Sequence, residues 1–90
     1  MLIYLPSSLA RLFVDVPHRL QVAPEEAPGS VREVIDLLDD RWPGMRDRLC
    51  SEGPELRRHI NVYVDREPAG LDTPVRPDSE IHVLPAVAGG

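Results

Sequence analysis

Apolar side chains occupy every second position in residues 18–23, 60–64 and 80–84, so each of these segments has one apolar face. Alternation of this kind is typical of a β-strand buried on one side. The positions expected to point into the core are Leu20, Val22, Ile60, Val62, Val64, Ile81 and Val83, whereas Tyr63, His82 and Leu84 are expected to point away from it. Residues 2–5 form a short apolar run that ends at Pro6, which predicts a strand buried on both faces.

The segment that begins at Ser30 has the period of a helix. Its apolar residues fall at i, i+3, i+4 and i+7 and form one stripe of Val31, Val34, Ile35 and Leu38. Ser30 and Glu33 have capping-box spacing, in which the hydroxyl and the carboxylate each accept a hydrogen bond from a free backbone N–H. We expect the helix to end before Pro43, because proline disfavours the helical conformation of the residue that precedes it. The acidic residues off the stripe are expected on a solvated face; they are Asp36, Asp39 and Asp40.

Shorter elements connect these segments. The pattern predicts a helical turn within residues 7–13, a loop at 24–29, a short helix at 44–51, turns at 51–54 and 65–68, and an irregular stretch at 71–77. Met45 and Leu49 are expected to face inward from the short helix, and Leu71 and Val75 from the irregular stretch.

Taken in order, these elements predict an α+β domain over residues 1–85, followed by a flexible tail at residues 86–90. The sheet can bury its apolar face only if the stripe of the main helix lies across it. The prediction is therefore a mixed sheet of four to five strands with one main helix packed on one face.

Composition narrows the range of functions. The formal net charge is −5 over 90 residues, which disfavours binding to nucleic acid or to anionic membranes and favours a partner with a basic docking face. No segment is long and apolar enough to cross a membrane, and the start of the chain does not have the pattern of a signal peptide. A single cysteine excludes an internal disulfide and is compatible with the cytoplasm. All ten basic residues are arginine.

No group of residues has the spacing of a catalytic or metal site. His18, His59 and His82 are far apart in the sequence and are expected to have structural roles. Cys50, near the end of the short helix, is expected to be a small buried hydrophobic residue rather than a nucleophile. The Arg57-Arg58 pair is too short for a nucleic-acid patch, although it could contact a partner.

The final residues differ from an ordinary frayed terminus, which would be polar. Leu84, Ala86 and Val87 are apolar, and an apolar strip of this kind points to a docking surface. Gly89 and Gly90 have no Cβ atom, so they could pass through a narrow channel. The carboxylate of Gly90 could then reach the active site of another protein and react there.

The order of elements, together with the ending Leu84-Pro85-Ala86-Val87-Ala88-Gly89-Gly90, resembles the β-grasp, ubiquitin-like sulfur-carrier proteins of the MoaD/ThiS family. The strand Ile60-Asn61-Val62-Tyr63-Val64 and the ending from Pro85 to Gly90 look most similar to the branch that serves cysteine biosynthesis in actinobacteria. The resemblance extends over the whole chain.

This resemblance implies a carrier that other enzymes act on, not an enzyme. An E1-like adenylyltransferase of the MoeB/ThiF type would use ATP and Mg²⁺ to adenylate the Gly90 carboxylate, and sulfur would then replace AMP to give a thiocarboxylate. A sulfur-acceptor synthase would take the sulfur for cysteine or another thio-metabolite. The implied carrier is a cytoplasmic monomer with no bound cofactor or metal.

Residues of the ending and the sheet would serve recognition by these enzymes. The partner-binding residues implied are Tyr63, Leu84, Pro85, Ala86, Val87, Ala88 and Gly89. Three alternatives remain open at this point: the small subunit of a molybdopterin synthase, a ubiquitin-like protein modifier that forms isopeptide bonds, and an interaction domain whose Gly-Gly ending has no role.

Overall fold

The computed structural model describes residues 1–85, so the predictions for the tail at residues 86–90 lie outside the described part of the chain. The main sheet has five strands in the order β2-β1-β7-β5-β6. Their bounds are β1 Leu2–Tyr4, β2 Arg19–Gln21, β5 Ile60–Val64, β6 Glu67–Ala69 and β7 Glu80–Pro85. The remaining elements are α1 Ser7–Ala10, the 3₁₀ turn η1 Pro24–Glu26, α2 Val31–Arg41, α3 Met45–Leu49, and the small hairpin of β3 Cys50–Ser51 with β4 Glu55–Leu56.

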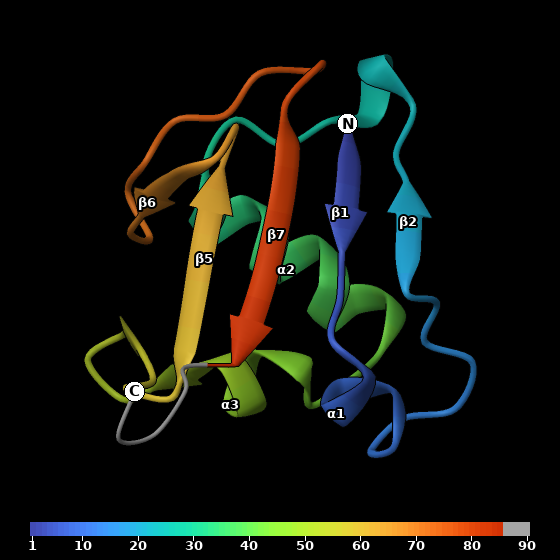
Figure 1. The fold of residues 1–90 in the computed structure, drawn as a ribbon, viewed down its shortest axis with the longest axis vertical. Coiled ribbons are helices and arrows are strands. Elements are labelled where there is room, and N and C mark those ends of the chain that lie inside the picture. Colours follow the sequence, from blue (N-terminus) through green and yellow to red (C-terminus); the bar gives the residue numbers. More distant parts are fainter. Residues whose placement is uncertain (86–90) are drawn as a thin grey trace.

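The sheet is mixed, as the sequence predicted. The two central strands, β1 and β7, run parallel, whereas every other neighbouring pair in the sheet is antiparallel. Figure 1 shows α2 crossing behind the strands, with α1 and α3 at the end of the sheet where β7 ends. The last strand of the sequence therefore lies in the middle of the sheet, and its final residue emerges beside the two short helices.

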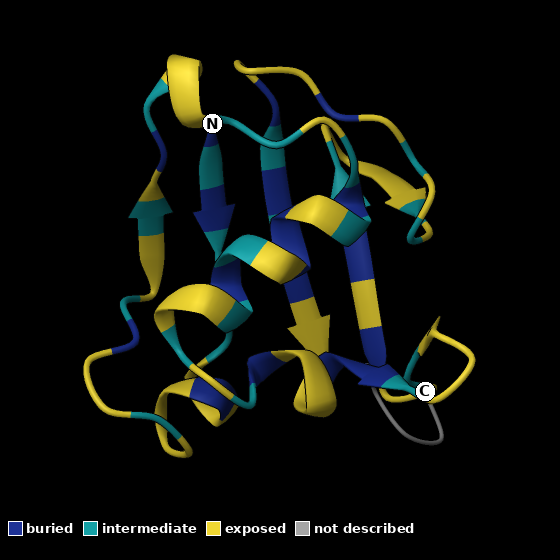
Figure 2. Ribbon diagram, turned by 180° about the vertical axis from the view of Figure 1, so that it is seen from behind, coloured by how far each residue is buried: buried dark blue, intermediate teal, exposed yellow. Residues whose placement is uncertain are grey.

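Helix α2 begins where the capping box predicted. The backbone N–H of Glu33 donates to the Ser30 hydroxyl at 3.3 Å, and the Glu33 carboxylate accepts from the backbone N–H of Gly29 at 2.9 Å. The apolar stripe is buried, and Leu38 has no exposed surface. In Figure 2 this helix is buried on the side that meets the sheet and exposed on the other.

The core lies between α2 and the inner face of the sheet, with α1 and α3 closing one end. Its fully covered side chains include Ile3, Leu38, Met45, Leu49 and Ile81. Each buried aliphatic side chain contributes about 1.5–3 kcal/mol of transfer free energy, so one such core supports the domain without a disulfide or a metal. The inward positions predicted for the short helix are confirmed.

The predictions for two strands, β1 and β6, differ from the structure. Strand β1 is not buried on both faces, because Leu2 and Tyr4 are half-exposed on the side away from α2. The turn predicted at 65–68 is confirmed at Asp65 and Arg66, whose φ values are 50° and 74°, but it is shorter than predicted because strand β6 begins directly after it at Glu67. Pro68 is compatible with this strand because an edge strand need not donate every N–H to the sheet.

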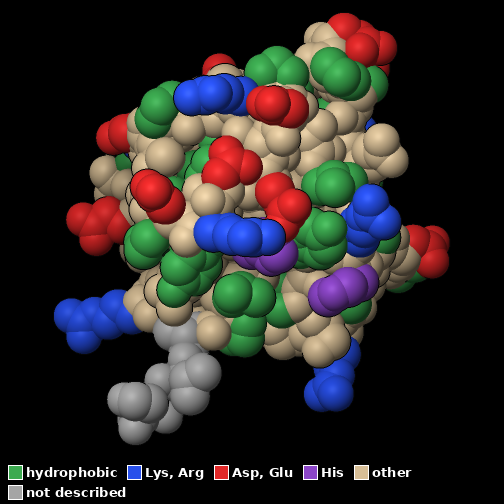
Figure 3. Space-filling view, turned by 45° about the horizontal axis from the view of Figure 1, so that its top comes forward, with side chains coloured by type: hydrophobic (Ala, Val, Ile, Leu, Met, Phe, Trp, Pro, Cys, Tyr) green, Lys and Arg blue, Asp and Glu red, His purple; other side chains and the backbone are tan. Residues whose placement is uncertain are grey.

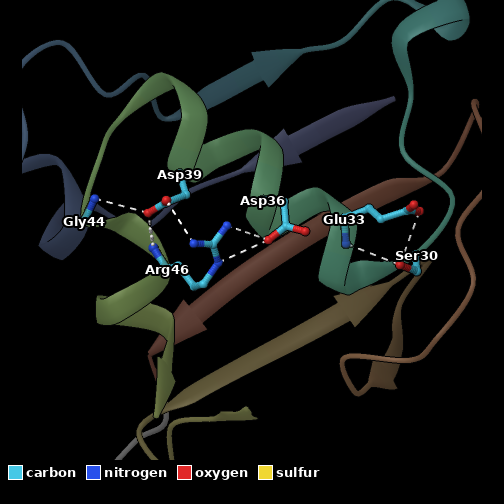
Figure 4. Close-up of polar contacts among 6 residues, drawn as sticks. All are labelled: Ser30, Glu33, Asp36, Asp39, Gly44 and Arg46. Carbon is cyan, nitrogen blue, oxygen red and sulfur yellow. Dashed lines mark hydrogen bonds and ion pairs between the residues drawn. The ribbon is translucent and has the colours of Figure 1, made fainter. Parts of the chain in front are cut away.

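The predicted solvated acidic face of α2 is confirmed at Asp36 and Asp40, which are exposed, whereas Asp39 is half-buried. Asp36 and Asp39 both pair with the guanidinium of Arg46, at 2.6 and 3.2 Å (Figure 4). Oδ1 of Asp39 also accepts hydrogen bonds from the backbone N–H groups of Gly44 and Arg46, at 3.1 and 3.0 Å. The hydrogen bond that the backbone N–H of Arg46 donates is the main reason why the pKa of Asp39 is lowered. The same hydrogen bond connects α2 to the start of α3.

We expect Asp39→Ala to lower the free energy of unfolding by about 1 kcal/mol, the usual cost of losing a side chain that caps free backbone N–H groups. Because folding lowers the pKa of Asp39, its contribution is present above the ordinary pKa of the carboxyl group and is lost as the pH falls through the lowered value. Urea denaturation at neutral pH and at acidic pH measures both effects. Asp40→Ala on the exposed side of α2 is the control, and an equal loss in the two variants would contradict the assignment.

Candidate functional site

The end of β7 is the point where the described chain leads into the predicted tail. Leu84 pairs with Asn61 and Pro85 pairs with Ile60, so the pairing of β7 includes its last residue. Leu84 is 42% exposed, the third most exposed of the large hydrophobic side chains in residues 1–85. Ala86, Val87, Ala88, Gly89 and Gly90, all predicted site residues, lie outside the described residues.

The side of the sheet away from α2 carries the other predicted contact residue, and we call it the outer face. It is defined by Tyr4, Asn61, Tyr63, His82 and Leu84. The register places Tyr4 beside His82 and His82 beside Tyr63, so three ring side chains cross the centre of the sheet in one row. Figure 3 shows hydrophobic and histidine side chains on this side of the molecule, with acidic and basic side chains among them.

Neighbouring side chains on the outer face contact one another and hold each other in place. The rings of Tyr4 and His82 stack with centroids 4.4 Å apart and planes inclined by 11°. Nε2 of His82 lies 2.7 Å from a carboxylate oxygen of Glu80. His18 meets the edge of Tyr4, and its Nδ1 lies 2.9 Å from the carbonyl oxygen of Leu5. A surface with several fixed aromatic rings suits a protein partner, because rigid rings lose little conformational entropy on binding.

The described residues do not gather metal-ligating side chains, and their cysteine is buried. Within residues 1–85, no three His, Cys, Asp or Glu side chains are placed to hold one metal ion. Cys50 is buried as predicted, and burial raises the pKa of its thiol, which disfavours the reactive thiolate. None of the helices in this part of the chain has the length and hydropathy that a membrane crossing requires.

The structure brings together some of the predicted residues. Tyr63 and Leu84 both lie on the outer face, as predicted, and Leu84 is followed directly by Pro85. Sequence reasoning missed Tyr4, because it lies in an apolar run that seemed to belong wholly to the core. The signal available was its phenol group, which in a short strand is more compatible with a half-exposed position.

The mixed sheet, with a main helix across one face and the last strand at its centre, defines the class of ubiquitin-like β-grasp proteins. A chain in the crystal structure of the Amycolatopsis orientalis BexX/CysO complex superposes with a TM-score of 0.81 and 32% sequence identity. The match covers 99% of this chain and 98% of that one. The fold prediction is therefore confirmed.

The chain belongs to the ThiS family, whose model matches residues 13–90. The sulfur carrier protein CysO of Mycobacterium tuberculosis is 36% identical over 63 residues, which cover 63% of this chain and 68% of that protein. The small archaeal modifier protein 1 of Haloferax volcanii is 29% identical over 65 residues, covering 72% and 75%. These relatives are named as a carrier and a modifier, and they confirm the predicted resemblance to the sulfur-carrier family and its CysO-like branch.

Proposed function

We propose that this protein is a sulfur carrier whose reactive group is the carboxylate of Gly90. The observation that supports this most directly is the family match, which continues through the Gly-Gly ending to residue 90. The exit of β7 at Pro85 is a second support, since the ending follows directly from a strand fixed between two neighbours.

The proposed chemistry has two steps. An E1-like adenylyltransferase joins the Gly90 carboxylate to the α-phosphate of ATP, with Mg²⁺ in the enzyme, and pyrophosphate leaves. Hydrosulfide then attacks the acyl carbon and expels AMP, which leaves a thiocarboxylate and one proton. A carboxylate is a poor electrophile, so the mixed anhydride with AMP supplies the leaving group that the sulfur step requires. An acceptor synthase takes the sulfur, for cysteine or another thio-metabolite, and we propose the cytoplasm as the compartment.

The domain serves as the recognition element in this proposal. Leu84 and Tyr63 on the outer face contact the activating enzyme, while residues 85–89 occupy the channel to its active site. Apolar and aromatic side chains at the centre of an interface contribute most of its binding free energy. The carrier itself holds no cofactor, because both ATP and Mg²⁺ belong to the partner.

The test is the intact mass of the protein after incubation with an E1-like adenylyltransferase from the same organism, ATP, Mg²⁺ and sulfide. We expect the mass to increase by the difference between a sulfur and an oxygen atom. Omission of ATP is the control and leaves the mass unchanged. An unchanged mass in the complete reaction, with pyrophosphate release also absent, would refute the proposal.

A second candidate function is protein modification, and the similarity to the small archaeal modifier protein 1 favours it. In that case an acyl group on Gly90 would be transferred to the amine of a lysine on another protein. The sequence contains no lysine of its own, so conjugation between copies through lysine is excluded. Peptide mapping of cell extract for lysines that carry the C-terminal peptide of this chain separates the two candidates, since a sulfur carrier leaves no such adduct.

A third reading, the small subunit of a molybdopterin synthase, uses the same thiocarboxylate. It differs in forming a lasting complex with a large subunit. Stable co-purification with such a subunit would favour it over a transient carrier.

A further inference from the structure

A groove at the tail end of the molecule lies outside the outer face. It has a volume of about 580 Å³ and runs between the residues after α1 and the start of β5. Its lining residues are Leu12, Phe13, Pro43, Gly44, Asp47, Arg48, Arg57 and His59. Figure 1 shows α1, α3 and the end of β7 at this end of the sheet.

One wall of the groove is apolar. Leu12 is 51% exposed, whereas the ring of Phe13 packs over the turn between α2 and α3. A Cβ atom on Gly44 would lie 3.5 Å from Cε1 of Phe13, and Gly44 has a φ of +99°, which L-residues rarely adopt. Glycine at this position therefore allows the turn that places the ring beside the groove.

The other wall carries positive charge. Nε of Arg57 donates to the carbonyl oxygen of Asp47 at 2.8 Å, and its backbone N–H donates to Leu49 at 2.9 Å, so the guanidinium is held against α3. Among residues 1–85, neither Arg48 nor Arg57 forms an ion pair with a carboxylate. A chain of net charge −5 therefore presents, within residues 1–85, two guanidinium groups without an ion pair in one place, next to the carboxylate of Asp47.

The groove adjoins the base of the tail. His59 directly precedes Ile60, whose partner across the sheet is Pro85, and the N–H of Ile60 donates to the carbonyl of Arg57. Because neighbouring strands are about 5 Å apart, Pro85 lies close to Ile60 and therefore to the groove residue His59. An enzyme that binds the chain just beyond Pro85 would therefore also contact this groove.

We propose that the groove docks an acidic segment of the enzyme that adenylates Gly90. An apolar side chain of that segment lies on Leu12 and Phe13, and its carboxylates pair with Arg48 and Arg57. This inference rests on the proposed function. Complementary charge at the edge of such an interface mainly raises the rate of encounter and fixes the orientation of the partners.

The test compares Arg48→Glu with Arg76→Glu in an ATP–pyrophosphate exchange assay with the activating enzyme from the same organism. Arg48 donates no side-chain hydrogen bond within residues 1–85, so its replacement spares the fold, and thermal melts verify this. Arg76 is an exposed residue shortly before β7, at the opposite end of the sheet, and its variant changes the net charge equally. Arg48→Glu is expected to raise KM for the carrier about tenfold with kcat nearly unchanged, whereas Arg76→Glu behaves as wild type.

Added salt distinguishes the groove further. The affinity of wild type and of Arg76→Glu for the activating enzyme is expected to fall as the salt concentration is raised. The affinity of Arg48→Glu should fall less, because this variant has already lost the attraction between Arg48 and the acidic segment. Equal KM values for the two variants would overturn the groove proposal alone. A lower KM for Arg48→Glu would also overturn it, because the groove would then hold the chain's own C-terminal segment. Absence of exchange with wild type overturns the proposed function and this inference together.

Discussion

Deletion of Gly89 and Gly90 is expected to abolish thiocarboxylate formation completely. The shortened chain ends in a carboxylate at Ala88, two residues short of the proposed reactive position. Each extended residue spans about 3.3–3.6 Å, so the carboxylate would stop about 7 Å from the point of adenylation. Pyrophosphate release and the intact mass after incubation with the activating enzyme, ATP and sulfide measure the loss.

The same deletion should leave the domain intact. The buried core side chains that the structure describes lie between Met1 and Val83. The free energy of unfolding is therefore expected to change by less than about 0.5 kcal/mol. A second variant lacks residues 86–88 but keeps Gly89 and Gly90. It tests the length of the tail separately from the identity of its last two residues, and it should also lose activity. Activity retained by either variant would count against a function that depends on the tail.

The largest expected effect on stability is that of Ile81→Ala. Ile81 lies in the central strand β7 with no exposed surface, between Ile3 of β1 and Val64 of β5. Removing a buried isoleucine side chain leaves a cavity and costs about 2–5 kcal/mol. Because domains are stable by only about 5–15 kcal/mol, this variant loses a large part of its stability. The midpoint of urea denaturation, with an unchanged slope, measures the loss.

Leu84→Ala is the matched control on the same strand. Leu84 faces outward and is 42% exposed, so its truncation should change stability by less than about 0.5 kcal/mol. The proposed function predicts instead a raised KM with the activating enzyme. If Leu84→Ala destabilised the protein as much as Ile81→Ala, the assignment of the two faces of β7 would be wrong.

The proposed function separates recognition from chemistry. In that proposal the outer face and the groove are contact surfaces, whereas the reactive carboxylate belongs to the tail. Within residues 1–85 the cysteine is buried and no metal-ligating side chains are grouped.

Local patterning determined much of the fold. The alternation in residues 60–64 and 80–84 fixed which side chains enter the core, because side chains of a strand point to opposite faces in turn. The apolar stripe and the capping box predicted the first residue of α2, since both signals lie within a few positions of one another. The Gly-Gly ending and its apolar approach were likewise readable from the sequence.

Other features depended on residues that meet only in the folded chain. Strand β6 exists because Glu67–Ala69 pairs with β5 after a left-handed turn, although its proline locally favours a turn. Tyr4 is half-exposed on the outer face, where its ring stacks on that of His82, a residue 78 positions later in the sequence. The charged groove combines residues from the segment after α1, from α3 and the turn before it, and from the segment that leads into β5. Sequence patterning therefore set the elements and their buried faces, whereas strand order and contacts between distant segments decided which side chains share a surface.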